Sequence, residues 1–237
     1  MVEGGLHLAK VTQIVSSAIK PGITLLELDA LANNTIVSQG DYPSFKTVPN
    51  YHHATCINLN DGIVHGLPNQ TVVQPGDIVS VDVGLIHKDY HLDTSITLQV
   101  PPLDGKITSF LETGKSALKK AVKQALPGNS IYQISEAIQT TIESAGYSVI
   151  RDLTGHGIGH HLHESPSIPC FRDSYYKKEI IKPGQALAIE IMYAMGDYHL
   201  SQDSDGWTIR TRDHSLTALF EDTVFITANG PEVLTSL

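Results

Sequence analysis

The sequence predicts an α+β fold in a single domain made of two similar halves, and two pairs of matching segments predict it. Pro21–Leu28 and Pro127–Ile134 each contain a Pro-Gly turn, a capping-box pattern and helically spaced apolar residues. Gln74–Asp82 and Lys182–Glu190 each contain a Pro-Gly turn and a strand-like run that ends in a carboxylate. The second copies follow the first after 106 and 108 residues. This nearly constant offset indicates a duplicated helix, helix, strand unit, whereas the alternative is chance similarity between common turns.

The helices and strands of each half follow in order. An amphipathic helix is predicted over Leu8–Ile19 and another over Ile107–Leu126. A loop-like stretch covers Gly40–Asn50. Strands are predicted by apolar or alternating runs at Ala54–Asn60, Ile78–Val83, Leu92–Val100, Ala186–Tyr193, Trp207–Thr211 and Thr223–Thr227. Since no linker interrupts the chain, we expect one domain over 1–237, with halves of about 1–104 and 105–237.

Composition narrows the class of protein. The formal charge of -9 argues against a nucleic-acid-binding surface, which needs a basic stripe. Cys56 and Cys170 are too few for a disulfide framework, which favours a reducing compartment and therefore the cytoplasm. No secretory signal is present, and no apolar run approaches the length of a membrane span. We expect no association with nucleic acid or membrane.

Five scattered side chains have the chemistry of metal ligands. Four are carboxylates and one is an imidazole, a set that suits two divalent cations better than one structural zinc ion. Most of them interrupt apolar, strand-like runs, where an unpaired charge is costly and requires a partner. The alternative is that they are ordinary surface acids. The five candidates are Asp82, Asp93, His156, Glu190 and Glu221.

A hairpin is predicted between two of these acids. If its centre lies between His87 and Lys88, then Asp82 faces Asp93 directly. Two carboxylates that close are unfavourable without cations. The hairpin therefore indicates a shared metal site.

The segment Thr154–Glu164 concentrates four histidines and three glycines. Glycines let the backbone approach a ligand closely, and neutral imidazoles bind metals or donate hydrogen bonds. The segment does not match the HExxH zinc-protease motif, because Ser167 occupies the place of the second histidine. We favour functional roles for His156 and His163 over His160 and His161.

Together these motifs resemble the methionine aminopeptidases of the bacterial, type I kind, whose fold is called the pita-bread fold. The similarity extends over nearly the whole chain. It implies an α+β fold in which helices pack on a curved antiparallel sheet in each of two pseudo-symmetric halves. The motifs that carry it are Ile57–Asn60, His65-Gly66, Asp82, Leu92–Ser95, Gly155–Gly159, His163–Pro166, Ile189-Glu190, Asp205–Thr208 and Glu221–Thr223.

The resemblance implies a dinuclear hydrolase. Asp82 would bind one ion, Asp93 and Glu221 would bridge both ions, and His156 and Glu190 would bind the other. Water acidified by the two ions would attack the first peptide bond. The cofactors would be two divalent ions, and Co, Mn, Fe and Zn all remain open.

Three residues would act on the substrate. Glu190 would accept a proton and pass it to the leaving amine. His163 would stabilise the oxyanion, while His65 would contact the amide of the next residue.

A methionine-binding pocket is implied less completely. Tyr51, Cys56, Phe45, Leu162 and Trp207 fall at pocket positions of the family, and a thiol with aromatic rings suits a thioether side chain. However, the family usually has Gly-Tyr-x-Gly-Tyr-Pro before the cysteine, and this chain has Val48 where one aromatic wall would stand. Leu162 also replaces a residue that is usually aromatic.

The expected function is removal of the N-terminal methionine from nascent proteins and peptides when the second residue is small. One alternative is an Xaa-Pro aminopeptidase or dipeptidase of the same fold, which typically carries a long N-terminal domain. The other is a non-catalytic relative that binds through the fold, although such proteins tend to lose ligands. A monomer is expected, and transient contact with the ribosome is left open.

Overall fold

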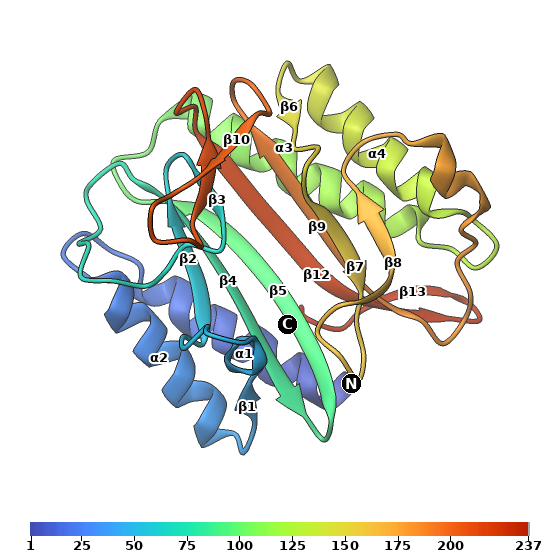
Figure 1. The fold of residues 1–237 in the computed structure, drawn as a ribbon, viewed down its shortest axis with the longest axis horizontal. Helices are drawn as coiled ribbons and strands as arrows, with labels where there is room; N and C mark the ends of the chain where they lie inside the picture. Colours follow the sequence, from blue (N-terminus) through green and yellow to red (C-terminus); the bar gives the residue numbers. More distant parts are fainter. Residues whose placement is uncertain (237) are drawn as a thin grey trace.

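Two pairs of helices pack against a long antiparallel sheet in the computed structural model, which describes residues 1–236 (Figure 1). The helices are α1 (Val2–Ala18), α2 (Leu25–Ser38), α3 (Gly105–Gln124) and α4 (Ile131–Ser144), with short 3-10 turns at Ser44–Thr47 and Ser174–Lys178. The sheet order is β1-β4-β5-β12-β9-β7-β8, and β2, β6 and β13 pair with β4, β9 and β12. These strands are β1 (Tyr42–Pro43), β2 (Thr55–Leu59), β4 (Ile78–His87), β5 (Tyr90–Gln99), β6 (Ser148–Val149), β7 (Thr154–Gly157), β8 (Glu164–Pro169), β9 (Ala186–Ala194), β12 (Thr217–Thr227) and β13 (Gly230–Val233).

The helices cover one face of this sheet. Val79, Val81 and Val83 on β4 belong to the apolar core under α1 and α2. Leu187 and Ile189 on β9 belong to the core under α3 and α4. Each such burial stabilises the fold by about 1.5–3 kcal/mol. Because strand side chains alternate between faces, the even-numbered residues of β4 and β9 point to the face without helices.

The helix starts and turns of the two halves match in detail. Glu27 Oε2 accepts a hydrogen bond from Thr24 N (2.8 Å), and Gln133 Oε1 accepts one from Ser130 N (2.5 Å), so the capping-box prediction is confirmed at both helices. All four Pro-Gly glycines are left-handed, a conformation that costs glycine little. They are Gly22, Gly76, Gly128 and Gly184, with φ of 95°, 88°, 89° and 90°.

The predicted register of the β4–β5 hairpin is wrong. Asp82 pairs with Ser95, and Asp93 pairs with Gly84. The turn consists of Lys88 and Asp89, with φ of 49° and 68°, as in a type I′ turn. That turn usually contains Asn-Gly or Asp-Gly, so its sequence signal is weak here. The shift is an even number of positions, and both carboxylates therefore remain on the same face.

Threonine hydroxyls join the two halves where β5 meets β12. Thr94 Oγ1 donates to Glu221 O (2.8 Å), and Thr223 Oγ1 donates to Asp93 O (2.7 Å). Thr97 Oγ1 donates to Leu219 O at 2.7 Å. These bonds extend the short backbone pairing at this junction, where the central strands of the sheet come from different halves.

A small sheet lies beside the main one, in the order β10-β11-β3, formed by β10 (Leu200–Gln202), β11 (Ile209–Thr211) and β3 (Gly62–Val64). β11 begins at Ile209, so the predicted strand over Trp207–Thr211 begins two residues too early. The reason is the carboxylate of Asp205, which accepts hydrogen bonds from Trp207 N and Thr208 N and holds these residues in the turn. Among residues 1–236, no helix has the length and apolar character that crossing a membrane requires.

Candidate active site

Four strands place polar side chains in one row on the helix-free face. Asp82 on β4 pairs with Ser95 on β5, Ser95 pairs with Glu221 on β12, and Glu221 pairs with Glu190 on β9. Cross-strand neighbours have Cβ atoms only about 4.5–5.5 Å apart. The register alone therefore brings together carboxylates that are far apart in the sequence.

Asp93 and His156 complete the cluster. Asp93 lies two residues before Ser95 on β5, and His156 on β7 pairs with Ala188, two residues before Glu190. Asp93, His156 and Glu221 each offer a ligand atom within 4.8 Å of the others. His156 Nε2 lies 3.4 Å from Glu190 Oε1, while its Nδ1 lies 2.8 Å from Gly157 O. That carbonyl contact leaves Nε2 facing the carboxylates, an arrangement common for metal-binding histidines.

Burial disfavours charge at this cluster. Desolvation, followed by the neighbouring Asp93, raises the pKa of Asp82, Glu190 and Glu221 well above the ordinary range. Desolvation also raises the pKa of Asp93 to about 7 and lowers the pKa of His156 to about 4. A group of carboxylates that resists ionisation on its own becomes favourable when cations are added.

The cluster fits divalent metal ions. Asp82 Oδ1 and Glu221 Oε1 are buried without a hydrogen-bond partner among residues 1–236. Such orphaned carboxylate oxygens are costly and require a partner, for which a cation is the natural choice. Carboxylates with one imidazole are ligands for borderline divalent ions.

A cavity of about 180 Å³ lies against the cluster. Its apolar side is a separate small core, in which the rings of Tyr51 and Trp207 meet edge to face at 5.0 Å and those of Phe45 and Tyr51 at 6.5 Å. Tyr51 Oη donates to Thr55 O at 2.7 Å and lies 3.1 Å from Cys56 Sγ. The cavity is lined by Phe45, Val48, Tyr51, Cys56, Val64, His65, Asp82, Asp93, His156, Leu162, His163, Glu190, Trp207 and Glu221.

The predicted site residues are thus all brought together in one cavity. His65 follows β3 with a left-handed φ of 58°, and His163 lies at the rim with its ring 4.5 Å from that of His156. Burial lowers the pKa of both His65 and His163, which favours the neutral imidazole. His160 lies apart and packs against Tyr90 at 4.5 Å.

Comparisons with known proteins agree with this geometry. The chain is 38% identical to methionine aminopeptidase 1 of Bacillus subtilis over 99% of this chain and 94% of the relative. The crystal structure of methionine aminopeptidase from Thermotoga maritima superposes with a TM-score of 0.96 at 37% identity, covering 100% of this chain and 95% of that one. The model of metallopeptidase family M24 matches residues 3–228. The chain belongs to metallopeptidase family M24.

Membership in M24 makes the protein a metal-dependent hydrolase and confirms the predicted pita-bread fold. The same fold also occurs in proteins with other activities. The prolidase from Pyrococcus horikoshii superposes with a TM-score of 0.80 at 22% identity, covering 99% of this chain and 60% of that one. At that identity the likeness shows the fold alone.

Some residues of this M24 site escape sequence reasoning. Val64 lines the cavity, and its only signal is its place just before His65 in an apolar run. A second hollow of about 520 Å³ includes Asp152 and Met192 beside the shared histidines, and neither residue belongs to a recognisable motif. The threonines at the β5–β12 junction appear in the sequence only as polar positions in a strand.

Metal binding should stabilise this M24 protein. We expect the unfolding temperature of chelator-treated protein to rise on addition of Mn²⁺ or Co²⁺, because the ions neutralise buried carboxylates only in the folded state. At an ion concentration of about 100 times Kd the gain is about 2.7 kcal/mol, or about 5–10 °C for a chain of this size. Differential scanning calorimetry measures it, with Ca²⁺ as a control ion that prefers more oxygen ligands. Equal unfolding temperatures with and without Mn²⁺ and Co²⁺ would contradict the metal assignment.

Proposed function

We propose that this chain is a methionine aminopeptidase, which removes the N-terminal methionine from peptides and nascent proteins by hydrolysing the first peptide bond. The observation that carries the proposal is that the five candidate ligands line the same small cavity as a group of aromatic and thiol side chains. The relatives named methionine aminopeptidase support it over nearly their full length.

The five clustered residues would hold two divalent ions, with Asp93 and Glu221 placed centrally enough to serve both. Ions held there supply Lewis-acid chemistry and acidify water. The protein's own contribution is the placement of its donors on five strands of one sheet, β4, β5, β7, β9 and β12, which fixes their geometry before any ligand arrives.

Three side chains would carry the proton and charge movements. Glu190 sits at the edge of the cluster nearest His156 and would accept a proton and pass it to the leaving amine. Neutral His163 would donate a hydrogen bond to the developing oxyanion. His65, which lines the same cavity, would contact the amide of the second residue.

The shape of the site favours an unbranched apolar first side chain and a small second one. The pocket lined by Tyr51 and Trp207 has room for one such side chain. The rest of the peptide would leave through the hollow of about 520 Å³, which shares His65, His156 and His163 with the pocket. Because these histidines stand where the two spaces join, a bulky second residue would collide with them.

A panel of peptides tests the proposal. We expect efficient cleavage of Met-Ala-Ser and slow cleavage of a matched peptide with a bulky second residue. Mass spectrometry measures the products, with the protein loaded in turn with Co, Mn, Fe or Zn. Discrimination against Leu-Ala-Ser should be weak, within about 1–3 kcal/mol, because Val48 and Leu162 leave an apolar wall without its aromatic rings. Ala-Pro-Ser serves as the competing substrate. Preference for Ala-Pro-Ser over Met-Ala-Ser would refute the assignment and favour an Xaa-Pro peptidase.

The organisation of the protein forms part of the proposal. We propose that residues 1–237 form one domain with halves of about 1–104 and 105–237, because the main sheet runs continuously across both.

A monomer is sufficient, since one chain supplies every group of the cavity. Cys56 and Cys170 are both free and buried, as suits a cytosolic protein. Transient contact with the ribosome would bring the site to nascent chains.

A further inference from the structure

Trp207 forms one wall of the pocket, and it stands on a turn outside the main sheet. The turn joins β10 to β11 and is rigid in itself, because Asp203 N donates to Thr208 O and the Asp205 carboxylate accepts from Trp207 N and Thr208 N. These bonds are all internal to the turn. They fix its shape but not its position relative to the pocket.

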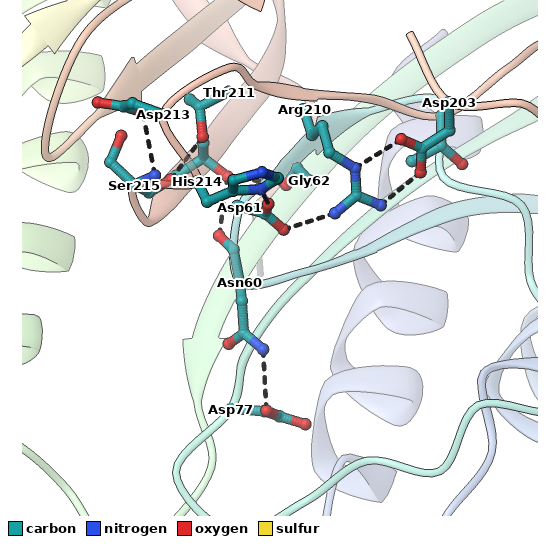
Figure 2. Close-up of polar contacts among 12 residues, drawn as sticks. Asn60, Asp61, Gly62, Asp77, Asp203, Arg210, Thr211, Asp213, His214 and Ser215 are labelled. Atoms are coloured by element: carbon teal, nitrogen blue, oxygen red, sulfur yellow. Dashed lines mark hydrogen bonds and ion pairs between the residues drawn. The ribbon is translucent and has the colours of Figure 1, made fainter. Parts of the chain in front are cut away.

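Beside the backbone pairing of β11 with β3, the side chain of Arg210 connects this turn to the rest of the molecule (Figure 2). Its guanidinium makes a two-pronged contact with the carboxylate of Asp203 at the base of the turn, with Nε 2.6 Å from Oδ1 and Nη2 on Oδ2. Its remaining nitrogen Nη1 donates to Asp61 Oδ1 at 2.8 Å. The guanidinium of Arg210 thus binds two carboxylates that are far apart in the sequence.

The Asp61 end of the contact is anchored. Asp61 O accepts from Thr211 N at 3.0 Å, and its Oδ2 lies 2.7 Å from His214 Nδ1. The preceding Asn60 is held by the main sheet, where its carbonyl accepts from Thr217 N of β12 at 2.9 Å and its side chain bonds Asp77. Arg210 therefore links a fixed point on the main sheet to the turn that carries Trp207.

Geometry distinguishes this contact from an ordinary surface ion pair, which contributes little. The side chains of Arg210, Asp61 and Asp203 are only 29%, 15% and 30% exposed. The planar guanidinium fork gives orientation as well as attraction, and a lysine cannot reproduce it.

We infer that Arg210 is a positioning residue for substrate selection: through Asp61 and Asp203 it holds the Trp207 turn over the pocket that receives the first side chain of the substrate. The role of Arg210 in substrate selection rests on the proposed function. The placement of Trp207 by Arg210 does not depend on that function.

The experiment uses Trp207 as its own reporter, because it is the only tryptophan in the chain. In Arg210→Ala we expect the fluorescence of Trp207 to shift to longer wavelength and to become more accessible to acrylamide. KM for Met-Ala-Ser should rise about tenfold, the low end of what apolar pocket contacts contribute, while kcat stays within about twofold. Metal content, measured by mass spectrometry, should not change.

Two further variants make the test specific. Arg210→Lys keeps the charge and loses the fork, so it should resemble Arg210→Ala in both KM and quenching, and it replaces Arg210→Ala should that variant not fold. Arg212→Ala removes an exposed guanidinium just after β11, and it should match the unmodified protein. Unchanged quenching in both Arg210 variants, or a KM effect equal to that of Arg212→Ala, would overturn the inference. Failure of the unmodified protein to cleave Met-Ala-Ser would instead refute the proposed function. The fluorescence result would then still test whether Arg210 places Trp207.

Discussion

Asp93→Ala and Glu221→Ala should each abolish peptide hydrolysis. Both carboxylates are buried at the centre of the cluster, on the adjacent strands β5 and β12, and each offers an oxygen to the proposed metal site. Removing either one would leave the two ions of the proposed site less shielded from each other. We expect metal content to fall below that of the unmodified protein and turnover to fall below detection.

Glu221→Gln should not unfold the metal-free protein. Glu221 Oε1 has no hydrogen-bond partner among residues 1–236, and burial raises the pKa of both Glu221 and Asp93. Glu221→Gln replaces this buried carboxyl group by a neutral amide at nearly constant volume, so the unfolding temperature of the metal-free protein should stay equal or rise. Asp222→Asn is the matched control, because Asp222 is the next residue on β12 and its Oδ1 bonds Thr235 instead. Full turnover in Glu221→Ala would disprove the central role of this carboxylate.

His163→Ala should separate catalysis from metal binding. If His163 donates to the oxyanion, its loss lowers kcat by on the order of 100-fold or more, while KM and metal content change little. Steady-state kinetics on Met-Ala-Ser and elemental analysis of the same preparation measure both quantities.

His160→Ala is the control for His163, since His160 lies in the same glycine- and histidine-rich segment but packs on Tyr90 outside the cavity. It should keep normal kinetics. Loss of metal from His163→Ala would show that this histidine is a ligand rather than an oxyanion donor.

The sequence predicts which residues form the site better than it predicts how these residues are arranged. Each acid that interrupts an apolar strand, such as Asp82 or Glu190, can be recognised because burial of an unpaired carboxylate is costly. The internal repeat explains why Asp82 and Glu190 hold equivalent positions in β4 and β9. The placement of these acids on one face follows from the two-residue period of strands, so it survives an error in register of an even number of positions.

The features that the sequence does not predict depend mostly on contacts between residues that are far apart in the chain. The register of the β4–β5 hairpin depends on the Lys88-Asp89 turn, whose residues seldom signal a type I′ conformation. The wall formed by Trp207 depends on Arg210 meeting Asp61, 149 residues away. Neither partner is unusual in its own segment, and only the folded chain makes them neighbours.

The position of β12 has a consequence for how the protein is made. β12 follows β5 and β9 in the chain, yet it lies between them in the sheet. During synthesis the two earlier strands therefore present open edges until residues 217–227 leave the ribosome, and open edges pair readily with other chains. Glu221 arrives with the strand that closes this gap. With the proposed role of Glu221, a chain arrested before that point would lack a central donor, and hydrolytic activity would begin only when the sheet is complete.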